Sequence, residues 1–116
     1  MTPPSEIFCG CIKSQLTAHV AWYADPVPVF YNGRNVSRSA VRNLRARIIS
    51  DTTRIDVRTN EPEIRVDADG RTATTVFRES YVFEGPRTNR RGNVVQELKW
   101  RKGDDGWRII AERTRS

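Results

Sequence analysis

The clearest pattern of hydrophobic and polar positions in the first half of the chain predicts an α-helix. Four apolar residues recur at spacings of three and four, which places them in one stripe on a helix. These residues are Ala40, Val41, Leu44 and Ile48. Asn35 or Ser37 can cap the helix. Arg38, Arg42 and Arg45 fall on its other faces, where we expect them to be solvated or, alternatively, to contact phosphate.

Two weaker helical segments, 5–16 and 17–24, are predicted before a proline turn. The second should end at Asp25–Pro26, because the residue before a proline disfavours the helical conformation. Residues 27–31 then predict a short strand, in which Pro28 requires a sheet edge or a bulge.

From Thr53 onward the hydrophobic period becomes two, which indicates β-strands. Residues 55–57 and 64–66 alternate in this way, and Asp69–Gly70 supplies a tight turn. A long strand is predicted from Arg71 to about Phe83, and its length favours a bend or a bulge.

The last third of the chain predicts a hairpin that follows a loop. Residues 84–92 are polar and read as the loop, whereas 93–101 and 107–114 form strands around a turn at 103–106. Pairing across this turn puts Trp100 opposite Ile109 on one face of the sheet. The same pairing puts Leu98 opposite Ala111.

This first face is predicted to be apolar and covered by helices. Its further members are Phe77, Glu79, Tyr81, Phe83, Val94, Gln96 and Trp107. Glu79 and Gln96 are its polar members, so their burial requires hydrogen-bond partners.

The opposite face mixes valines with charges of both signs, which suits a self-complementary dimer interface. The residues predicted to form it are Val76, Arg78, Val82, Val95, Glu97, Ile110 and Glu112. An ordinary solvated sheet face is the alternative.

Composition favours one globular domain over residues 1–116, since 37% of the residues are hydrophobic and 29% are charged. The net charge of +6 suits an anionic partner, but acidic residues are interleaved throughout, and we expect no nucleic acid. No apolar run approaches the roughly 20 residues of a membrane helix, and the N-terminus lacks a secretory pattern, so a cytoplasmic protein is expected.

Ligands for a metal are few. Cys9 and Cys11 would point apart on a helix and are expected to be free thiols. His19 is the only histidine, so we expect neither a metal nor a cofactor.

Four stretches together resemble the nuclear transport factor 2-like (SnoaL-like, ketosteroid isomerase-like) superfamily, in an accessory form similar to copies attached to other bacterial proteins. They are Tyr23-Ala24-Asp25, Gly33 to Arg38, Phe77 to Tyr81 and Gly106 to Ile110. The resemblance implies an α+β, cystatin-like fold, in which N-terminal helices pack on the concave face of a strongly curved antiparallel sheet.

The resemblance also implies a pocket in the mouth of this cone. Tyr31 stands where isomerase-like members place a catalytic aspartate, and a phenol is a poor base at neutral pH. Glu79 would be a base if burial raised its pKa; the alternative is a hydrogen bond to Gln96 that only satisfies both side chains. Dehydratase-like chemistry would need a histidine, for which His19 is the candidate.

We therefore expect a non-catalytic domain that binds a small organic ligand or associates with a partner, and that dimerises through its sheet. The predicted ligand residues are Tyr23, Tyr31, Glu79, Tyr81, Gln96 and Trp100. The alternative is a small isomerase or dehydratase that uses Glu79 as base and Tyr31 or His19 as hydrogen-bond donor.

Overall fold

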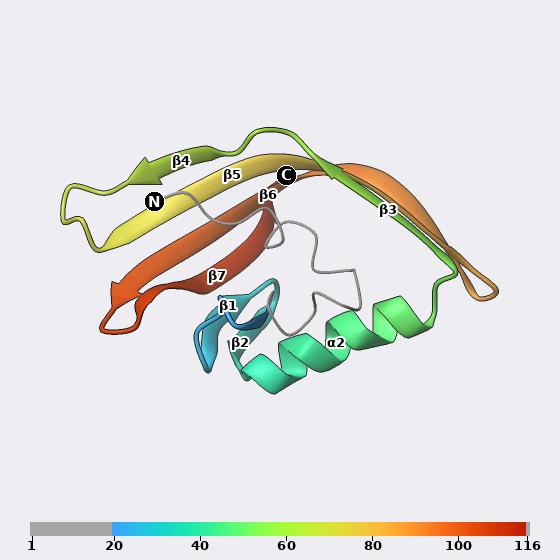
Figure 1. Ribbon diagram of the computed structural model, residues 1–116, viewed down its shortest axis with the longest axis horizontal. Helices are drawn as coiled ribbons and strands as arrows, with labels where there is room; N and C mark the ends of the chain where they lie inside the picture. The colour runs from blue at the N-terminus through green and yellow to red at the C-terminus, as the bar shows by residue number, and fades with distance from the viewer. Residues whose placement is uncertain (1–19, 116) are drawn as a thin grey trace.

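The computed structural model describes residues 20–115, which form a curved seven-stranded sheet arched over one helix (Figure 1). The elements are β1 (Val27–Phe30), β2 (Gly33–Val36), α2 (Arg38–Ser50), β3 (Arg54–Thr59), β4 (Glu63–Val66), β5 (Thr72–Gly85), β6 (Thr88–Gly103) and β7 (Gly106–Arg115). The α+β architecture is therefore confirmed. The predicted helix over 5–16, both cysteines and His19 lie outside the described residues, and a single domain over 1–116 stays a prediction.

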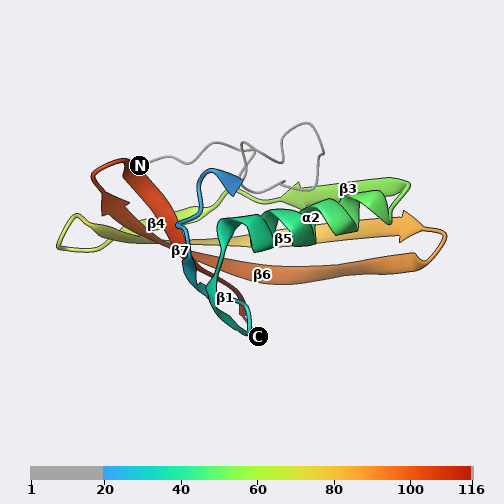
Figure 2. The same cartoon turned by 90° about the horizontal axis from the view of Figure 1, so that it is seen from below.

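The strand order is β2-β1-β7-β6-β5-β3, and β4 also pairs with β5. The sheet is antiparallel except where β1 runs parallel to β7. We call the face toward α2 the inner face and the opposite face the outer face (Figure 2). β1 lies between two strands rather than at an edge, and Pro28 has no Cα partner in the register of either neighbour.

Helix α2 begins as predicted but presents a different side to the sheet. Ser37 is the N-cap, and its hydroxyl accepts a hydrogen bond from the Ala40 amide at 3.1 Å. Val41 is buried, whereas Leu44 is 41% exposed and Ala40 is also exposed. The predicted stripe was therefore partly wrong. The inward side instead carries Arg45, because a buried acidic partner on the sheet compensates its charge.

The predicted loop over 84–92 was wrong, because the hairpin of β5 and β6 continues through it. Gly85 pairs with Thr88, so only Pro86 and Arg87 form the turn. This end of the hairpin is largely exposed, which explains its polar composition. The predicted helix over 17–24 also ends earlier, since Tyr23 forms a β-bridge with Ile109.

The register of β7 changes near its middle. Trp100 pairs with Ile109 as predicted, but Lys99 pairs with Ala111, so Ile110 is an extra residue and forms a β-bulge. Beyond the bulge, Leu98 faces Glu112 instead of Ala111. Because side chains alternate between the two faces, one extra residue reverses the direction of those that follow.

The core lies between the inner face and α2. Its buried residues are Val20, Tyr23, Val27, Phe30, Val41, Ala73, Phe77, Leu98, Trp100 and Ile109. Trp107 packs against this cluster on the same face as Trp100, as predicted. The Trp100 indole N–H donates to the Thr75 hydroxyl at 3.0 Å, so this polar atom is satisfied within the core.

Candidate functional site

Strand β7 brings two distant tyrosines to one carboxylate. Next to Tyr23, the Ala24 amide donates a hydrogen bond to the Ile109 carbonyl oxygen of β7 at 2.9 Å. Farther along, the Tyr31 amide donates to the Glu112 carbonyl at 2.7 Å. The two tyrosines therefore lie on either side of the Glu112 side chain.

The Glu112 carboxylate is held on both oxygens. The Tyr23 hydroxyl donates to Oε1, and the Tyr31 hydroxyl donates to Oε2 at 2.5 Å. Nη2 of Arg45 lies 2.7 Å from Oε2. We call these four residues the Glu112 cluster. Only 6% of Glu112 is exposed, so this is a nearly dry ion pair with two additional donors.

The electrostatics fix the charge state of the cluster. Burial, followed by the charge of Glu112, raises the pKa values of Tyr23 and Tyr31 well above that of free tyrosine. Burial alone would lower the pKa of Arg45, but the charge of Glu112 and the contributions of Tyr23 and Tyr31 together outweigh it, so the pKa is raised. Both phenols are therefore neutral donors at physiological pH, and neither can act as a base.

The backbone at Tyr31 is shaped to aim its ring inward. Tyr31 has a φ of 53°, in the left-handed region that bulky residues rarely adopt. Its ring packs edge-on against Phe30 at 4.9 Å, and the Arg45 guanidinium lies 5.6 Å from the Phe30 ring. Such local strain persists only where surrounding contacts stabilise it, which here are those of the cluster.

A second carboxyl, Glu79, lies next to this cluster on the inner face. Burial raises the pKa of Glu79, while Arg45 and a hydrogen bond from Gln96 oppose this shift. Gln96 also connects to the cluster, since its amide donates to the Tyr31 hydroxyl at a long 3.4 Å. Its carbonyl oxygen accepts from Thr114 at 3.3 Å. Gln96 therefore stabilises the charged form of Glu79, as the expected hydrogen bond between the two side chains would.

The structure brings together four of the six predicted ligand residues: Tyr23, Tyr31, Glu79 and Gln96. Trp100 is 1% exposed and belongs to the core. Tyr81 lies farther along β5, where its ring stacks on Phe83 at 5.3 Å and covers Gly92. A Cβ at Gly92 would lie 2.9 Å from the Tyr81 hydroxyl oxygen, so glycine leaves room for this ring.

Sequence reasoning missed the two charged members of the cluster. Arg45 was assigned to a solvent-facing row, although it lies four residues after the buried Val41 and four before Ile49, which packs on the core. Glu112 was predicted on the outer face and in the dimer interface. This prediction was wrong, because the β7 bulge turns Glu112 to the inner face. The spacing on α2 was a usable signal, whereas nothing in the sequence marks the bulge.

The outer face carries a different arrangement around Glu97. Its carboxylate accepts from Arg113 Nη2 at 2.7 Å and from Arg115 Nε at 2.8 Å, within the same chain. Val76, Arg78, Val82 and Val95 lie on this face, as expected from the strand alternation. Ile110 is the extra residue of the bulge. Their predicted role in a dimer is not tested by these contacts.

Residues 20–115 contain no group of three or more His, Cys, Asp or Glu side chains placed to hold a metal ion. Within the same range, no helix is long and apolar enough to cross a membrane.

Comparison with known proteins defines the fold. No protein-family model matches the sequence, and neither does any curated protein. Among solved structures, an NTF2-like protein with a cystatin-like fold from Novosphingobium aromaticivorans superposes with a TM-score of 0.71 at 13% identity, covering 95% of this chain and 74% of that one. A candidate dehydratase of the NTF2-like family from Streptomyces avermitilis gives 0.71 at 18% identity, covering 93% and 87%.

A third structure is a candidate calcium/calmodulin-dependent protein kinase II association domain from Xanthomonas campestris. It superposes with a TM-score of 0.69 at 15% identity, and the match covers 94% of this chain and 79% of that one. The chain therefore has a cystatin-like fold similar to that of these NTF2-like proteins, which is the fold that its sequence resemblance implied. This scaffold supports unrelated roles, so the function has to be argued from the site.

Proposed function

We propose that the inner face of the sheet binds a small organic ligand beside Tyr31, Glu79 and Gln96, and that the domain holds this ligand without transforming it. One observation carries the proposal: the two inner carboxyls are satisfied to different degrees. Glu112 is bonded on both oxygens. For Glu79, only Arg45 and Gln96 among residues 20–115 stabilise the charged form, and burial still raises its pKa.

An incompletely satisfied carboxyl on an apolar face lowers the stability of the fold. A ligand that donates a hydrogen bond to Glu79 would offset this cost. Phe77 and Tyr81, which flank Glu79 on the inner face of β5, supply the aromatic walls that are common in small-molecule sites. The proposed ligand therefore has an apolar or aromatic body and a hydroxyl or amine group.

We propose that the site does not catalyse a reaction, because its other polar side chains already bind one another. Both phenols are neutral and donate to Glu112, whose negative charge is balanced by Arg45. This arrangement holds Tyr31 in place and leaves no second acid or base beside Glu79 in the described chain.

The proposal is tested by thermal denaturation at pH 7 with matched phenols, aromatic amines and aromatic carboxylates. Phenols or amines should raise the Tm, and carboxylates should not, because they would lie against Glu79. Glu79→Gln should reduce the shift, whereas Glu61→Gln, at an exposed site, should leave it unchanged. The proposal fails if no compound stabilises the chain or if Glu79→Gln retains the full shift.

A second candidate function is enzymatic, with Glu79 as a general base. The raised pKa makes Glu79 more basic than an ordinary carboxylate, and one similar structure is a candidate dehydratase. In this case the chain would exchange the α-protons of an added ketone, such as cyclohexanone, with D2O. Proton NMR would detect exchange above the buffer rate, and Glu79→Gln should abolish it.

Self-association is supported by the similarity to a candidate association domain. Dimerisation through the outer face stays a prediction. Sedimentation equilibrium tests it directly: if the chain forms a dimer through this face, Val82→Asp should convert it to monomers.

A further inference from the structure

The basic residues of the sheet gather on its outer face. Residues paired across an antiparallel sheet share a face, so the registers assign each side chain to one side. Strands β3, β4 and β5 direct Arg54, Arg58, Arg65 and Arg78 outward. Strands β6 and β7 add Arg91, Lys99, Arg101, Arg108, Arg113 and Arg115.

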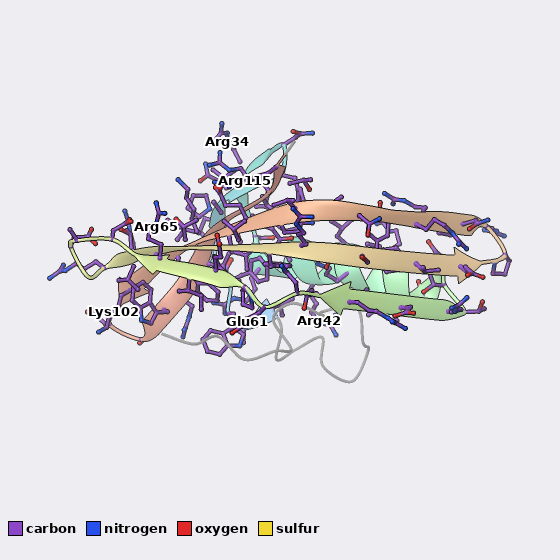
Figure 3. The ribbon with its side chains drawn as sticks, turned by 90° about the horizontal axis from the view of Figure 1, so that it is seen from above. Arg34, Arg42, Glu61, Arg65, Lys102 and Arg115 are labelled. Atoms are coloured by element: carbon purple, nitrogen blue, oxygen red, sulfur yellow. The ribbon has the colours of Figure 1, made fainter. Side chains whose placement is uncertain are left out.

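The acidic residues on the same face of β3–β7 are only Asp56, Glu63, Glu84 and Glu97. Ten basic and four acidic side chains leave an excess of six positive charges on this face. Of the four acids only Glu63 is exposed, since Glu97 is buried beneath its two arginines and Asp56 and Glu84 are half-buried. The charge that meets solvent is therefore positive across the face, from Arg65 on β4 to Arg115 at the end of β7 (Figure 3).

Three valines lie among these charges. Val76 and Val82 on β5 and Val95 on β6 face outward and are half-buried. Beside Val82, a shallow groove of about 300 Å³ opens between β3, β5 and β6. It is lined by Asp56, Arg58, Ser80, Val82, Arg91 and Asn93, together with Tyr81 and Gly92.

The arginines of this groove are available to a partner. Arg58 lies 3.3 Å from Asp56 and Arg91 lies 3.5 Å from Glu84, but the arginine side chains are 81% and 67% exposed. Such exposed ion pairs contribute little to stability, so a carboxylate of another protein can replace the acid in them. Arginine binds carboxylates in a bidentate manner, which suits an acidic partner in the groove.

Three occupants compete for this face, and its chemistry separates them. A second copy would place the same positive excess against itself in a two-fold contact. The outward positions of β3–β7 carry no aromatic side chain on which bases could stack, and valines do not contribute to nucleic-acid binding of this kind. An acidic protein surface matches both features, because protein interfaces combine an apolar centre with a polar rim.

We propose that the outer face of the sheet docks an acidic surface of a partner protein. Aliphatic side chains of the partner pack on Val76, Val82 and Val95, and its carboxylates pair with the surrounding arginines, including Arg58 and Arg91 in the groove. This surface is separate from the inner-face ligand site and does not depend on it.

The test uses the full chain and three fluorescent probes, measured by anisotropy at 50 and 300 mM NaCl. The probes are a peptide of alternating Glu and Val, a matching peptide of Lys and Val, and a DNA duplex. The Glu–Val peptide should bind most tightly and weaken roughly tenfold at the higher salt concentration. Weaker binding of this peptide than of the duplex, or no binding at all, would overturn the proposal.

Variants locate the site. Arg58→Glu with Arg91→Glu should weaken the Glu–Val peptide at least about tenfold. The matched pair Arg42→Glu with Arg47→Glu changes the charge equally at exposed positions of α2 and should have little effect. Val82→Ser should also weaken the peptide. Equal losses of affinity from both pairs of substitutions would show unspecific charge attraction and would contradict the proposal. The proposal would also be contradicted if the free chain formed a dimer and Arg58→Glu with Arg91→Glu converted it to monomers, because the face would then bind a second copy.

Discussion

Two glutamates on β6 and β7 are buried to almost the same extent but are held in different ways. Glu97 on the outer face is 4% exposed and Glu112 on the inner face is 6% exposed. The arginines of Glu97 come from the adjacent strand and are 52% and 54% exposed. Arg45, the partner of Glu112, comes from α2 and is 21% exposed, and the two tyrosines come from separate segments.

This difference shows that the exposure of an acid alone does not determine its energetic importance. If Glu97 lost its charge, Arg113 and Arg115 would return to water at little cost. If Glu112 lost its charge, Arg45 would remain in the interior without its ion-pair partner and with only the more distant Glu79 to compensate it. Glu112 also joins the helix to the sheet, whereas Glu97 joins two strands that are already hydrogen-bonded. Four measurements test this comparison.

The largest effect is expected for Glu112→Gln. The substitution keeps the shape of the side chain but leaves Arg45 without its ion-pair partner, so the free energy of unfolding should fall by about 3–5 kcal/mol. Urea denaturation measures this quantity. Adding Arg45→Met to the variant should recover part of the loss. A loss as small as that of Glu97→Gln would contradict the distinction between the two sites.

Removing single donors to Glu112 should have an intermediate effect. Tyr23→Phe and Tyr31→Phe each delete one hydrogen bond to a charged group, which is worth about 1.5–3 kcal/mol. Tyr23→Phe should be the more severe, because Tyr23 is fully buried and Tyr31 is not. Urea titrations measure both variants. Equal losses in the free energy of unfolding would show that burial of the tyrosine does not determine the strength of its hydrogen bond to Glu112.

Glu97→Gln should lower the free energy of unfolding by only about 1 kcal/mol. Burial acts to raise the pKa of Glu97, but the hydrogen bonds and charges of Arg113 and Arg115 outweigh it and hold the pKa below its usual 4.5. The contribution of Glu97 is therefore present above pH 4.5 and lost as the pH falls through the lowered pKa. Denaturation of both proteins between pH 3 and pH 7 should show their difference closing at low pH.

The smallest effect, and one of opposite sign, is expected for Glu79→Gln. Because burial raises the pKa of Glu79, its contribution to stability is present below pH 4.5 and lost as the pH rises through the raised value. The variant should therefore gain stability relative to the natural chain between pH 4 and pH 7. A relative loss over this range would indicate that the Glu79 carboxylate is fully satisfied.

The sequence was sufficient for the features set by local rules. The cap at Ser37, the turn of β6 and β7, and the inner-face positions of Glu79 and Gln96 all follow from residue preference and strand alternation. Contacts between segments that are distant in the chain could not be predicted from the sequence. The partnership of Arg45 and Glu112 spans 67 residues, and neither residue reveals its burial without the other.

Two further differences had other physical causes. Residues 88–92 are polar because that end of the hairpin is largely exposed, which a composition-based reading cannot distinguish from a loop. The bulge at Ile110 lies in a run of apolar residues without glycine or proline, so no local signal announces it.

The bulge gives the length of β7 a direct influence on the chemistry of the interior. If β7 kept Ile110 but paired regularly through it, every charged residue would remain and yet Glu112 would turn into solvent, while Arg113 would turn inward toward Arg45. Homologues with this carboxylate should thus either keep the bulge or lack the residue that corresponds to Ile110, because both arrangements hold the carboxylate on the inner face.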